Sequence, residues 1–392
     1  MIKVKLGDIC KIYAGTGFPV QYQGEKNGEY PFYKVGDISR NVENGNIYLQ
    51  ECNNYISSET VKKIKGTILP IDTVVFAKIG EAVKLNRRAI TTQNCLIDNN
   101  VMGIYPNQET ISLQYFYYYI SNIKLEKFAE ATTIPSVKKS IVEKLEIPLP
   151  QYEEQIRIST LLDNINNLIS LRRQQIEKLD ELVKARFVEL FGNLVIGDKV
   201  DTNKKKIGEI ASVTKLAGFE FTKYIQYKEQ GDIIMLRGLN CKKGHLVLDD
   251  IKWIDKETSD LLPRSKLYYG DILMTYAGTI GDVAMVDADD KYHLAPNVAK
   301  ITLNDKKACN PVFLMHLFMY TNDYIMTFAS VVAQASINME KIRNFEYYFP
   351  PVELQNQFAA FVEQTDKSKL TIQQSLDKLE VLKKSLMQKY FG

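Results

Sequence analysis

The chain repeats itself at an interval of 200 residues, and this duplication limits the possible folds more than any other feature. Residues 146–155 return as 346–355, with two prolines, a glutamate and a glutamine in the same order. The first half ends on Phe191-Gly192 and the second on Phe391-Gly392, again 200 positions apart. Solenoid repeats are far shorter, at roughly 20–50 residues. We therefore predict a duplicated domain and a duplicated helix, with two equivalent surfaces for a symmetric partner or for two partners.

Composition indicates a globular protein of more than one domain. A chain of 392 residues exceeds the usual domain of about 100–200 residues. Hydrophobic residues make up 45% and charged residues 25%, as in folded proteins. No run of about 18 uncharged apolar residues occurs, so we expect no membrane span. Residues 1–8 alternate like a strand and lack the apolar stretch of a signal peptide.

Cysteine usage indicates the cellular compartment of the chain, and its net charge limits how it could bind nucleic acid. The five cysteines are scattered, without a CxxC pair: Cys10, Cys52, Cys95, Cys241 and Cys309. This pattern is typical of free buried thiols in a reducing cytosol, so we expect a cytoplasmic protein. The net charge of +3 is only mildly basic. If the chain binds nucleic acid, its basic residues must be concentrated locally, or partners must supply part of the charge.

The globular part of each half alternates short apolar runs with turn-forming residues. Residues 74–77 and 101–105 are predicted strands, and 113–128 is more helical. In the second half, 235–240 corresponds to 32–37, and 279–284 to 78–83. Asn297-Val298 likewise corresponds to Asn100-Val101. The two globular parts should therefore share a fold while their loop residues differ.

A long helix is predicted after each proline pair. Residues 151–190 contain no proline or glycine, and their apolar side chains recur every three or four positions. Residues 351–390 repeat this pattern, and a helix of about 40 residues is roughly 60 Å long. We expect the two helices to pair as a coiled coil; the alternative is that each packs on a separate domain. Arg172-Arg173 interrupts the first stripe, which indicates a weak point or a surface for another protein.

No catalytic constellation is visible in the sequence. His245, His293 and His316 lie in different segments without metal-like spacing. No phosphate-binding GxxxxGK[ST] loop, Gly-x-Ser-x-Gly elbow or amino-methyltransferase motif occurs. We therefore predict a recognition protein that is not an enzyme and that needs no cofactor.

The order of these features resembles the DNA-specificity (S) subunits of type I restriction–modification enzymes. The motifs that carry the resemblance are the junction 147–155, the glycine pattern 278–281 and the closing segment 378–392. The resemblance covers essentially the whole chain. The first half departs from it in having only Lys78-Ile79-Gly80 at the glycine motif, and the second in having Leu354 where Glu154 stands in the first.

The resemblance implies an α+β fold in which two pseudo-symmetric globular target-recognition domains are joined by two long antiparallel helices forming a coiled coil. The expected divisions are target-recognition domain 1 at 1–150, a central helical spacer at 151–193, target-recognition domain 2 at 194–349 and a C-terminal helical spacer at 350–392. Each domain would read one half of a bipartite, asymmetric site in double-stranded DNA. The helices would set the distance between the domains.

The resemblance also implies partners. The helices would dock two methyltransferase (M) subunits, which would bind S-adenosylmethionine in place of this chain. Restriction/translocase (R) subunits would join the assembly. Two alternatives stay open: a solitary nucleic-acid-binding protein, and a coiled-coil scaffold whose globular ends bind proteins. A methyltransferase gene next to this one would favour the specificity subunit over both alternatives. A full complex that binds no nucleic acid would favour the scaffold.

Candidate DNA-binding residues follow from the side chains that read bases, which are Arg and Lys for guanine and Asn and Gln for adenine. Lys34 and Arg237 occupy equivalent positions after a strand, and Thr279 lies where a backbone can approach a phosphate closely. Single loop charges and turn-forming asparagines are often only structural, so we expect several contacts from the set rather than all of them. The full set is Lys34, Asp37, Lys78, Arg87, Arg88, Asn100, Lys138, Lys139, Arg237, Asn240, Thr279, Asn297 and Asn338.

Overall fold

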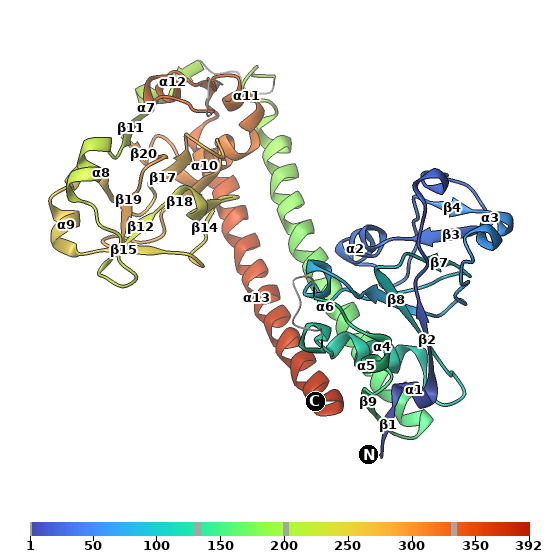
Figure 1. Ribbon diagram of the computed structural model, residues 1–392. Helices are drawn as coiled ribbons and strands as arrows, with labels where there is room; N and C mark the ends of the chain where they lie inside the picture. The colour runs from blue at the N-terminus through green and yellow to red at the C-terminus, as the bar shows by residue number, and fades with distance from the viewer. Residues whose placement is uncertain (1, 129–134, 199–203, 331–334) are drawn as a thin grey trace. The chain divides into compact units, whose positions relative to one another are not determined.

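The fold is given by a computed structural model, which describes residues 2–128, 135–198, 204–330 and 335–392 (Figure 1). Its contacts gather the chain into two compact units. The first unit comprises Met1–Arg172 and Ser375–Gly392, and the second comprises Arg173–Gln374. Two helices of 40 residues, α6 (Tyr152–Phe191) and α13 (Val352–Phe391), belong partly to each unit.

Within the described residues, the first unit contains three small sheets. A four-stranded antiparallel sheet has the order β2 (Cys10–Ala14), β8 (Val101–Pro106), β5 (Val74–Ala77), β6 (Ala89–Ile90). A three-stranded sheet has the order β4 (Tyr55–Ile56), β3 (Tyr30–Tyr33), β7 (Leu96–Ile97), with β3 and β7 parallel. Strand β1 (Ile2–Lys5) pairs with β9 (Glu146–Leu149). The helices are α1 (Leu6–Ile9), α2 (Val35–Glu43), α3 (Ser58–Lys63), α4 (Leu113–Asn122) and α5 (Lys139–Val142).

The second unit repeats this plan. Its first sheet has the order β11 (Ala211–Lys215), β20 (Val298–Leu303), β17 (Ile272–Thr275), β18 (Val283–Met285). The other has the order β15 (Lys252–Ile254), β12 (Ile233–Leu236), β19 (Tyr292–Leu294), β16 (Lys266–Leu267), with β12 and β19 parallel. Strand β10 (Lys204–Lys206) pairs with β21 (Glu346–Tyr348). The helices are α7 (Ile207–Ile210), α8 (Gly218–Tyr224), α9 (Lys256–Asp260), α10 (Pro311–Tyr320), α11 (Asn322–Met326) and α12 (Met339–Arg343).

The matching strand orders confirm that the two globular parts share a fold. The predicted strands at 74–77 and 101–105 are β5 and β8, and the predicted helix contains α4. All four residues of β5 are buried, because Val74 and Phe76 face a core with α4 while Val75 faces the second sheet. Successive side chains of a strand point to opposite faces, so a strand covered on both sides is a continuous apolar run.

The correspondence between 78–83 and 279–284 is wrong, and the backbone pairing shows why. The Lys78 N–H donates to the carbonyl of Asn100 at 2.8 Å, and the Tyr276 N–H donates to that of Asn297 at 3.0 Å. Lys78 therefore corresponds to Tyr276, and Gly80 to Gly278, both of which have positive φ (77° and 83°). Residue identity matched Gly80 to Gly281 instead, because the turns between these strands differ in length and the turn of the first copy is the longer one.

The two copies differ most in the segment after their central parallel strand. In the first unit β3 leads into α2, which has nine residues. In the second unit β12 leads into a single 3₁₀ turn, Gly238–Asn240, followed by a hairpin of β13 (Cys241–Lys242) and β14 (His245–Leu246). The shared sheets thus hold unlike loops at the same place.

The long helices pair antiparallel within each unit, which confirms the predicted coiled coil. In the second unit, Phe187 and Phe191 near the end of α6 pack on Phe358 near the start of α13, with ring centroids 5.3 and 5.6 Å apart. In the first unit, Ile158 and Leu162 near the start of α6 share a core with the end of α13. The border between the units falls at Arg172 and Arg173, where the sequence interrupts the apolar stripe.

The Phe-Gly ending of each helix is explained by the aromatic residues around it. Phe191 lies 5.0 Å from Phe313 of α10 in the second unit, measured between ring centroids. Phe391 lies 5.0 Å from Tyr115 of α4 in the first unit. Helix α6 therefore starts at the junction of the first copy and ends against the first turn of α10. Helix α13 starts at the junction of the second copy and ends against the first turn of α4.

The repeated junction glutamine has the same role in both copies. Gln155 accepts the N–H of Ser112 at 2.8 Å and donates to the Pro150 carbonyl at 3.0 Å. Gln355 accepts the N–H of Asn310 at 2.9 Å and donates to the Pro350 carbonyl at 2.7 Å. Both side chains are 1% exposed, as expected for polar groups whose hydrogen bonds are satisfied in the interior. We call these contacts the glutamine bridges. Each one ties the start of a long helix to the N-cap of α4 or α10.

No helix in the described part of the chain is long and apolar enough to cross a membrane. All five cysteines are free thiols; three of them are buried and Cys10 and Cys52 are partly buried. Burial raises the pKa of Cys10 and Cys95 to about 12, which keeps these thiols protonated and unreactive at neutral pH.

Candidate nucleic-acid interface

Lys34 and Arg237 occupy the same structural position, as the sequence predicts. Each immediately follows the central parallel strand and precedes a helical turn. The Lys34 N–H donates to Oδ2 of Asp37 at 2.8 Å, and the Arg237 N–H donates to Oδ1 of Asn240 at 3.0 Å. The residue three positions on therefore fixes the backbone of each basic residue in the same way.

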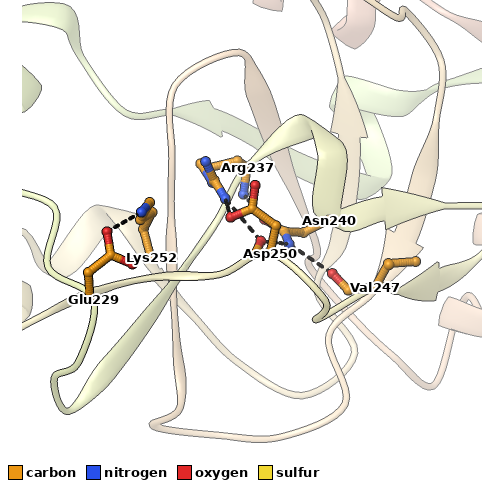
Figure 2. Close-up of polar contacts among 6 residues, drawn as sticks. All are labelled: Glu229, Arg237, Asn240, Val247, Asp250 and Lys252. Carbon is orange, nitrogen blue, oxygen red and sulfur yellow. Dashed lines mark hydrogen bonds and ion pairs between the residues drawn. The ribbon is translucent and has the colours of Figure 1, made fainter. Parts of the chain in front are cut away.

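The Arg237 side chain is held at the wall of a cavity. Its Nη2 donates to Oδ1 of Asp250 at 2.7 Å and to the Asp250 carbonyl at 2.9 Å (Figure 2). The side chain of Arg237 is 21% exposed and that of Asp250 is 63% exposed. Burial raises the pKa of Tyr227, and the charge of Arg237 partly offsets this.

Three candidates of the second domain share that cavity. Its volume is about 420 Å³, and Arg237, Thr279 and Asn297 all line it. Apolar and aromatic groups complete the wall, which consists of Phe221, Tyr227, Gly238, Leu239, Thr275, Ala277 and Pro296 besides the three polar residues. A concave surface with a few convergent polar groups is the usual form of a recognition site.

Asn240 is fully buried and supports the loop that holds Asp250. Its Nδ2 donates to the carbonyl of Val247 at 2.8 Å and to that of Asp250 at 2.9 Å (Figure 2). Its side chain is therefore engaged inside the protein at both ends. Lys252 and Glu229 lie beside this loop, where their side chains form an ion pair with each other.

The first domain arranges its equivalent residues differently. Asp37 is 4% exposed and is paired with Arg40 of α2. The Lys34 ammonium donates to Oε1 of Gln23 and lies 5.4 Å from the centre of the Phe18 ring. A neutral amide thus stands beside Lys34 where a carboxylate stands beside Arg237.

A second group of candidates lies together at the ends of β5 and β8. The Lys78 N–H donates to Asn100, and the Lys78 carbonyl accepts the N–H of Val137, the residue before Lys138. Lys138 and Lys139 are exposed, and Lys139 lies 3.7 Å from Glu143. The backbone therefore brings Lys78, Asn100 and Lys138 to one edge of the first domain.

The second domain has the same edge with other side chains. The Tyr276 N–H donates to Asn297, and the Tyr276 carbonyl accepts the N–H of Ile337, the residue before Asn338. Asn338 caps α12 by accepting the Lys341 N–H at 2.8 Å. Thr279 is exposed in the turn that follows, where its carbonyl accepts the Thr275 hydroxyl.

Arg87 and Arg88 have internal partners. Arg88 is 3% exposed, and its Nη2 donates to Asn86 at 2.8 Å while its guanidinium lies 4.9 Å from the centre of the Phe76 ring. Burial lowers the pKa of Arg88 to about 10, so the group stays charged at neutral pH. Arg87 pairs with Glu43 at the end of α2, at 2.7 Å. Both arginines are therefore engaged within the protein, and a DNA contact by either of them stays a prediction.

Sequence reasoning missed three features of this surface. Tyr276 is the structural counterpart of Lys78, but the misaligned glycine turn concealed it. Asp250 holds Arg237 from 13 residues away, and no local motif marks that contact. The glutamine bridges were visible as a repeated glutamine, whose role depends on a helix that lies elsewhere in the sequence. Among the described residues, no group of three or more His, Cys, Asp or Glu side chains is placed to hold a metal ion.

Comparisons with known proteins agree with this architecture. The chain matches the sequence profile of the type I restriction modification DNA specificity domain over residues 1–181 and 199–383. It is 24% identical to the type I restriction enzyme MjaVIII specificity subunit of Methanocaldococcus jannaschii, over 98% of this chain and 90% of that protein.

Two solved structures share the fold. One is the S subunit of a type I restriction–modification system from M. genitalium, with a TM-score of 0.55 and 13% identity, covering 100% of this chain and 96% of that one. The other comes from a study of complex assembly and conformational transition of the type I R-M system, with a TM-score of 0.62 and 15% identity, covering 100% and 97%.

The chain therefore belongs to the family of type I restriction–modification DNA specificity subunits. It is a recognition subunit and not an enzyme.

Proposed function

We propose that this chain reads two unlike half-sites in double-stranded DNA, one with each globular domain, and brings catalytic subunits to that site. The observation that carries this proposal is the pair of loops built on equivalent strands. Both place a basic residue at the same capped position, yet one presents Lys34 with Gln23 and the other Arg237 with Asp250. Identical frames with unlike polar groups suit the reading of an asymmetric, bipartite sequence.

Each candidate side chain has a role that its exposure suits. Arginine and lysine pair with guanine and asparagine with adenine in the major groove, while other contacts to phosphates position the protein. We assign direct contacts to the candidates that follow the equivalent strands, line the cavity or lie at the strand-end edges, which are Lys34, Lys78, Asn100, Lys138, Lys139, Arg237, Thr279, Asn297 and Asn338. We assign loop support to the buried Asp37, Arg88 and Asn240, and to Arg87, which is tied to α2 through Glu43.

The long helices offer a surface for protein partners. Several large apolar side chains on them are exposed, among them Leu171 at 55%, Leu370 at 61% and Val381 at 70%. A contiguous exposed apolar patch marks a protein contact, and we infer that these side chains belong to such a patch. Because the chain is duplicated, we infer two methyltransferase subunits, which would bind S-adenosylmethionine, with restriction/translocase subunits joining them. Such an assembly would act on DNA in the cell interior, so we place it in the cytoplasm.

The domain limits inferred from the sequence fit this division of labour. Domain 1 would span 1–150 and domain 2 would span 194–349, with spacers at 151–193 and 350–392. These limits place the loops that carry Lys34 and Arg237 in the domains, and both long helices in the spacers.

A selection experiment tests the proposal. The chain is purified alone and in complex with the methyltransferase subunit of the same system, and each is used to select duplexes from a random DNA library. The complex should enrich two different short sequences separated by a fixed number of unread base pairs. The chain alone should not turn over S-adenosylmethionine. Enrichment of no sequence, or turnover by the chain alone at the rate of the complex, would overturn the proposal.

A further inference from the structure

Asp250 is held beside Arg237 in the second domain by hydrogen bonds to its backbone and its side chain. It lies in the loop between β14 and β15, and its carbonyl accepts hydrogen bonds from Asn240 and from Arg237, each at 2.9 Å. Its Oδ1 accepts a further bond from Arg237 at 2.7 Å. Two different side chains thus hold the backbone of Asp250, while its carboxylate remains 63% exposed (Figure 2).

These bonds restrict how Arg237 can meet a base. A guanidinium has five N–H groups, and both bonds to Asp250 come from Nη2. The buried Nε has no partner among the described residues. Asp250 therefore engages Nη2 and holds the plane of the guanidinium, and because Nε is buried, Nη1 is the group left to meet an acceptor.

The other carboxylate oxygen of Asp250, Oδ2, can accept a hydrogen bond from a base. A carboxylate accepts hydrogen bonds and donates none, and in the major groove it suits the N4 amino group of cytosine. It repels the acceptors of guanine and thymine, and it repels phosphates as well. A carboxylate on a surface that binds a polyanion is costly unless it contributes to selectivity.

We propose that Asp250 is a specificity-determining residue. It orients Arg237 toward a guanine, and its carboxylate accepts a hydrogen bond from the amino group of a cytosine in a neighbouring base pair. This rests on the proposed function, because it assumes that the cavity beside Arg237 faces DNA. In the first domain the side-chain hydrogen-bond partner of the Lys34 ammonium is instead Gln23, an amide that both accepts and donates. The two domains then discriminate at these positions by different chemistry.

The test compares D250N and D250A with a matched control, E229Q. The D250N variant would keep the carbonyl bonds and an acceptor for Arg237, but would present an amide donor in place of the free oxygen. Glu229 is an exposed carboxylate paired with Lys252 on the neighbouring strand, so E229Q removes the same charge from the same region without touching Arg237. Thermal unfolding of each complex checks that the domain is intact.

Binding of each complex is measured on the selected site and on duplexes carrying every substitution in the half-site of the second domain. For D250N we expect the preference for cytosine at one base pair to fall by roughly 5- to 100-fold, with a shift toward a base that offers an acceptor. D250A should lose that preference and also weaken the neighbouring guanine preference, while E229Q should leave the base preferences unchanged.

The outcomes separate the two claims. If the wild-type complex shows no sequence preference, the proposed function fails, and this inference fails with it. If the wild-type complex is selective but D250N keeps every base preference, or weakens all duplexes equally, Asp250 is only a structural brace and the inference alone is wrong.

Discussion

At the scale of single residues, burial decides which polar groups are available for recognition. Lys34 and Arg237 follow equivalent strands and keep an exposed part, whereas Asp37 and Asn240 are buried three positions further on and bond the backbone. The same pair of positions thus separates a side chain that stays accessible from one that fixes its backbone. Charge alone does not make this distinction, because Arg88 is a charged arginine like Arg237 and is buried.

Burial also makes one histidine sensitive to acid. His316 of α10 is 5% exposed, and its Nδ1 donates to the Val312 carbonyl at 2.8 Å beside Phe358. Burial lowers the pKa of His316 from 6.5 to about 4. The folded state therefore favours the neutral ring, and its contribution to stability is present above pH 6.5 and is lost as the pH falls toward 4.

We expect His316 to lower the free energy of unfolding by about 2 kcal/mol when the pH falls from 7 to 5. H316Q removes the titration and should reduce the difference between urea midpoints measured at the two pH values. An equal loss of stability in the wild type and in H316Q would show that other groups cause the acid sensitivity.

The sequence predicts single residues well where a local pattern determines them. The equivalence of Lys34 and Arg237 follows from matching strands, and the structure places both at the same cap. The partner of Arg237 could not be predicted, because Asp250 reaches it only after the chain has turned through a hairpin that the first copy lacks. Arg88 resembles an exposed loop charge until the packing of Phe76 beneath it is known.

At the scale of elements, the glutamine bridges connect helices that are distant in sequence. Each one satisfies a buried N–H at the N-cap of α4 or α10 and a proline carbonyl at the junction. Leaving such groups unpaired costs about 1–3 kcal/mol. The repeat preserves the glutamine but not Glu154, whose carboxylate pairs with the exposed Arg157.

We therefore expect Q155A and Q355A each to destabilise the chain by about 1–3 kcal/mol in urea unfolding. Q151A is the matched control, since Gln151 is exposed at the same junction, and it should change stability little. Equal effects of Q151A and Q155A would mean that the bridge contributes nothing beyond the properties of the junction itself.

Elements with a strong period are predictable, and short loops are not. The absence of proline and glycine, with apolar residues every three or four positions, predicts both long helices nearly to the residue. The glycine turn after β5 was misaligned because a turn can lengthen without disturbing the strands beside it. Only the hydrogen bonds of Lys78 and Tyr276 reveal the true correspondence.

At the scale of the whole molecule, each long helix is divided between two contact units. The borders lie between Arg172 and Arg173 in α6 and between Gln374 and Ser375 in α13. Residues inserted at both borders would lengthen the helices without interrupting the contacts inside either unit. This offers a direct way to test whether helix length sets the spacing of the half-sites.

Seven residues inserted at both borders preserve the apolar stripe and add roughly 10 Å to each helix. We expect the unread spacer to lengthen by up to about three base pairs, at about 3.4 Å each, while both half-site sequences stay the same. Inserting two residues turns the stripe by about 200° and should abolish assembly with the methyltransferase. A spacer that is unchanged in an active seven-residue variant would refute the role of helix length.

The most direct test of the central claim is to map the DNA motif modified by the complete complex in three forms: wild type, K34A and R237A. The wild-type motif should be two unlike half-sites around a fixed spacer. K34A should relax a position in one half-site and R237A a position in the other, each losing about 1–3 kcal/mol of discrimination. A contiguous or perfectly palindromic wild-type motif, or relaxation of the same half-site by both variants, would contradict the claim that each domain reads its own sequence.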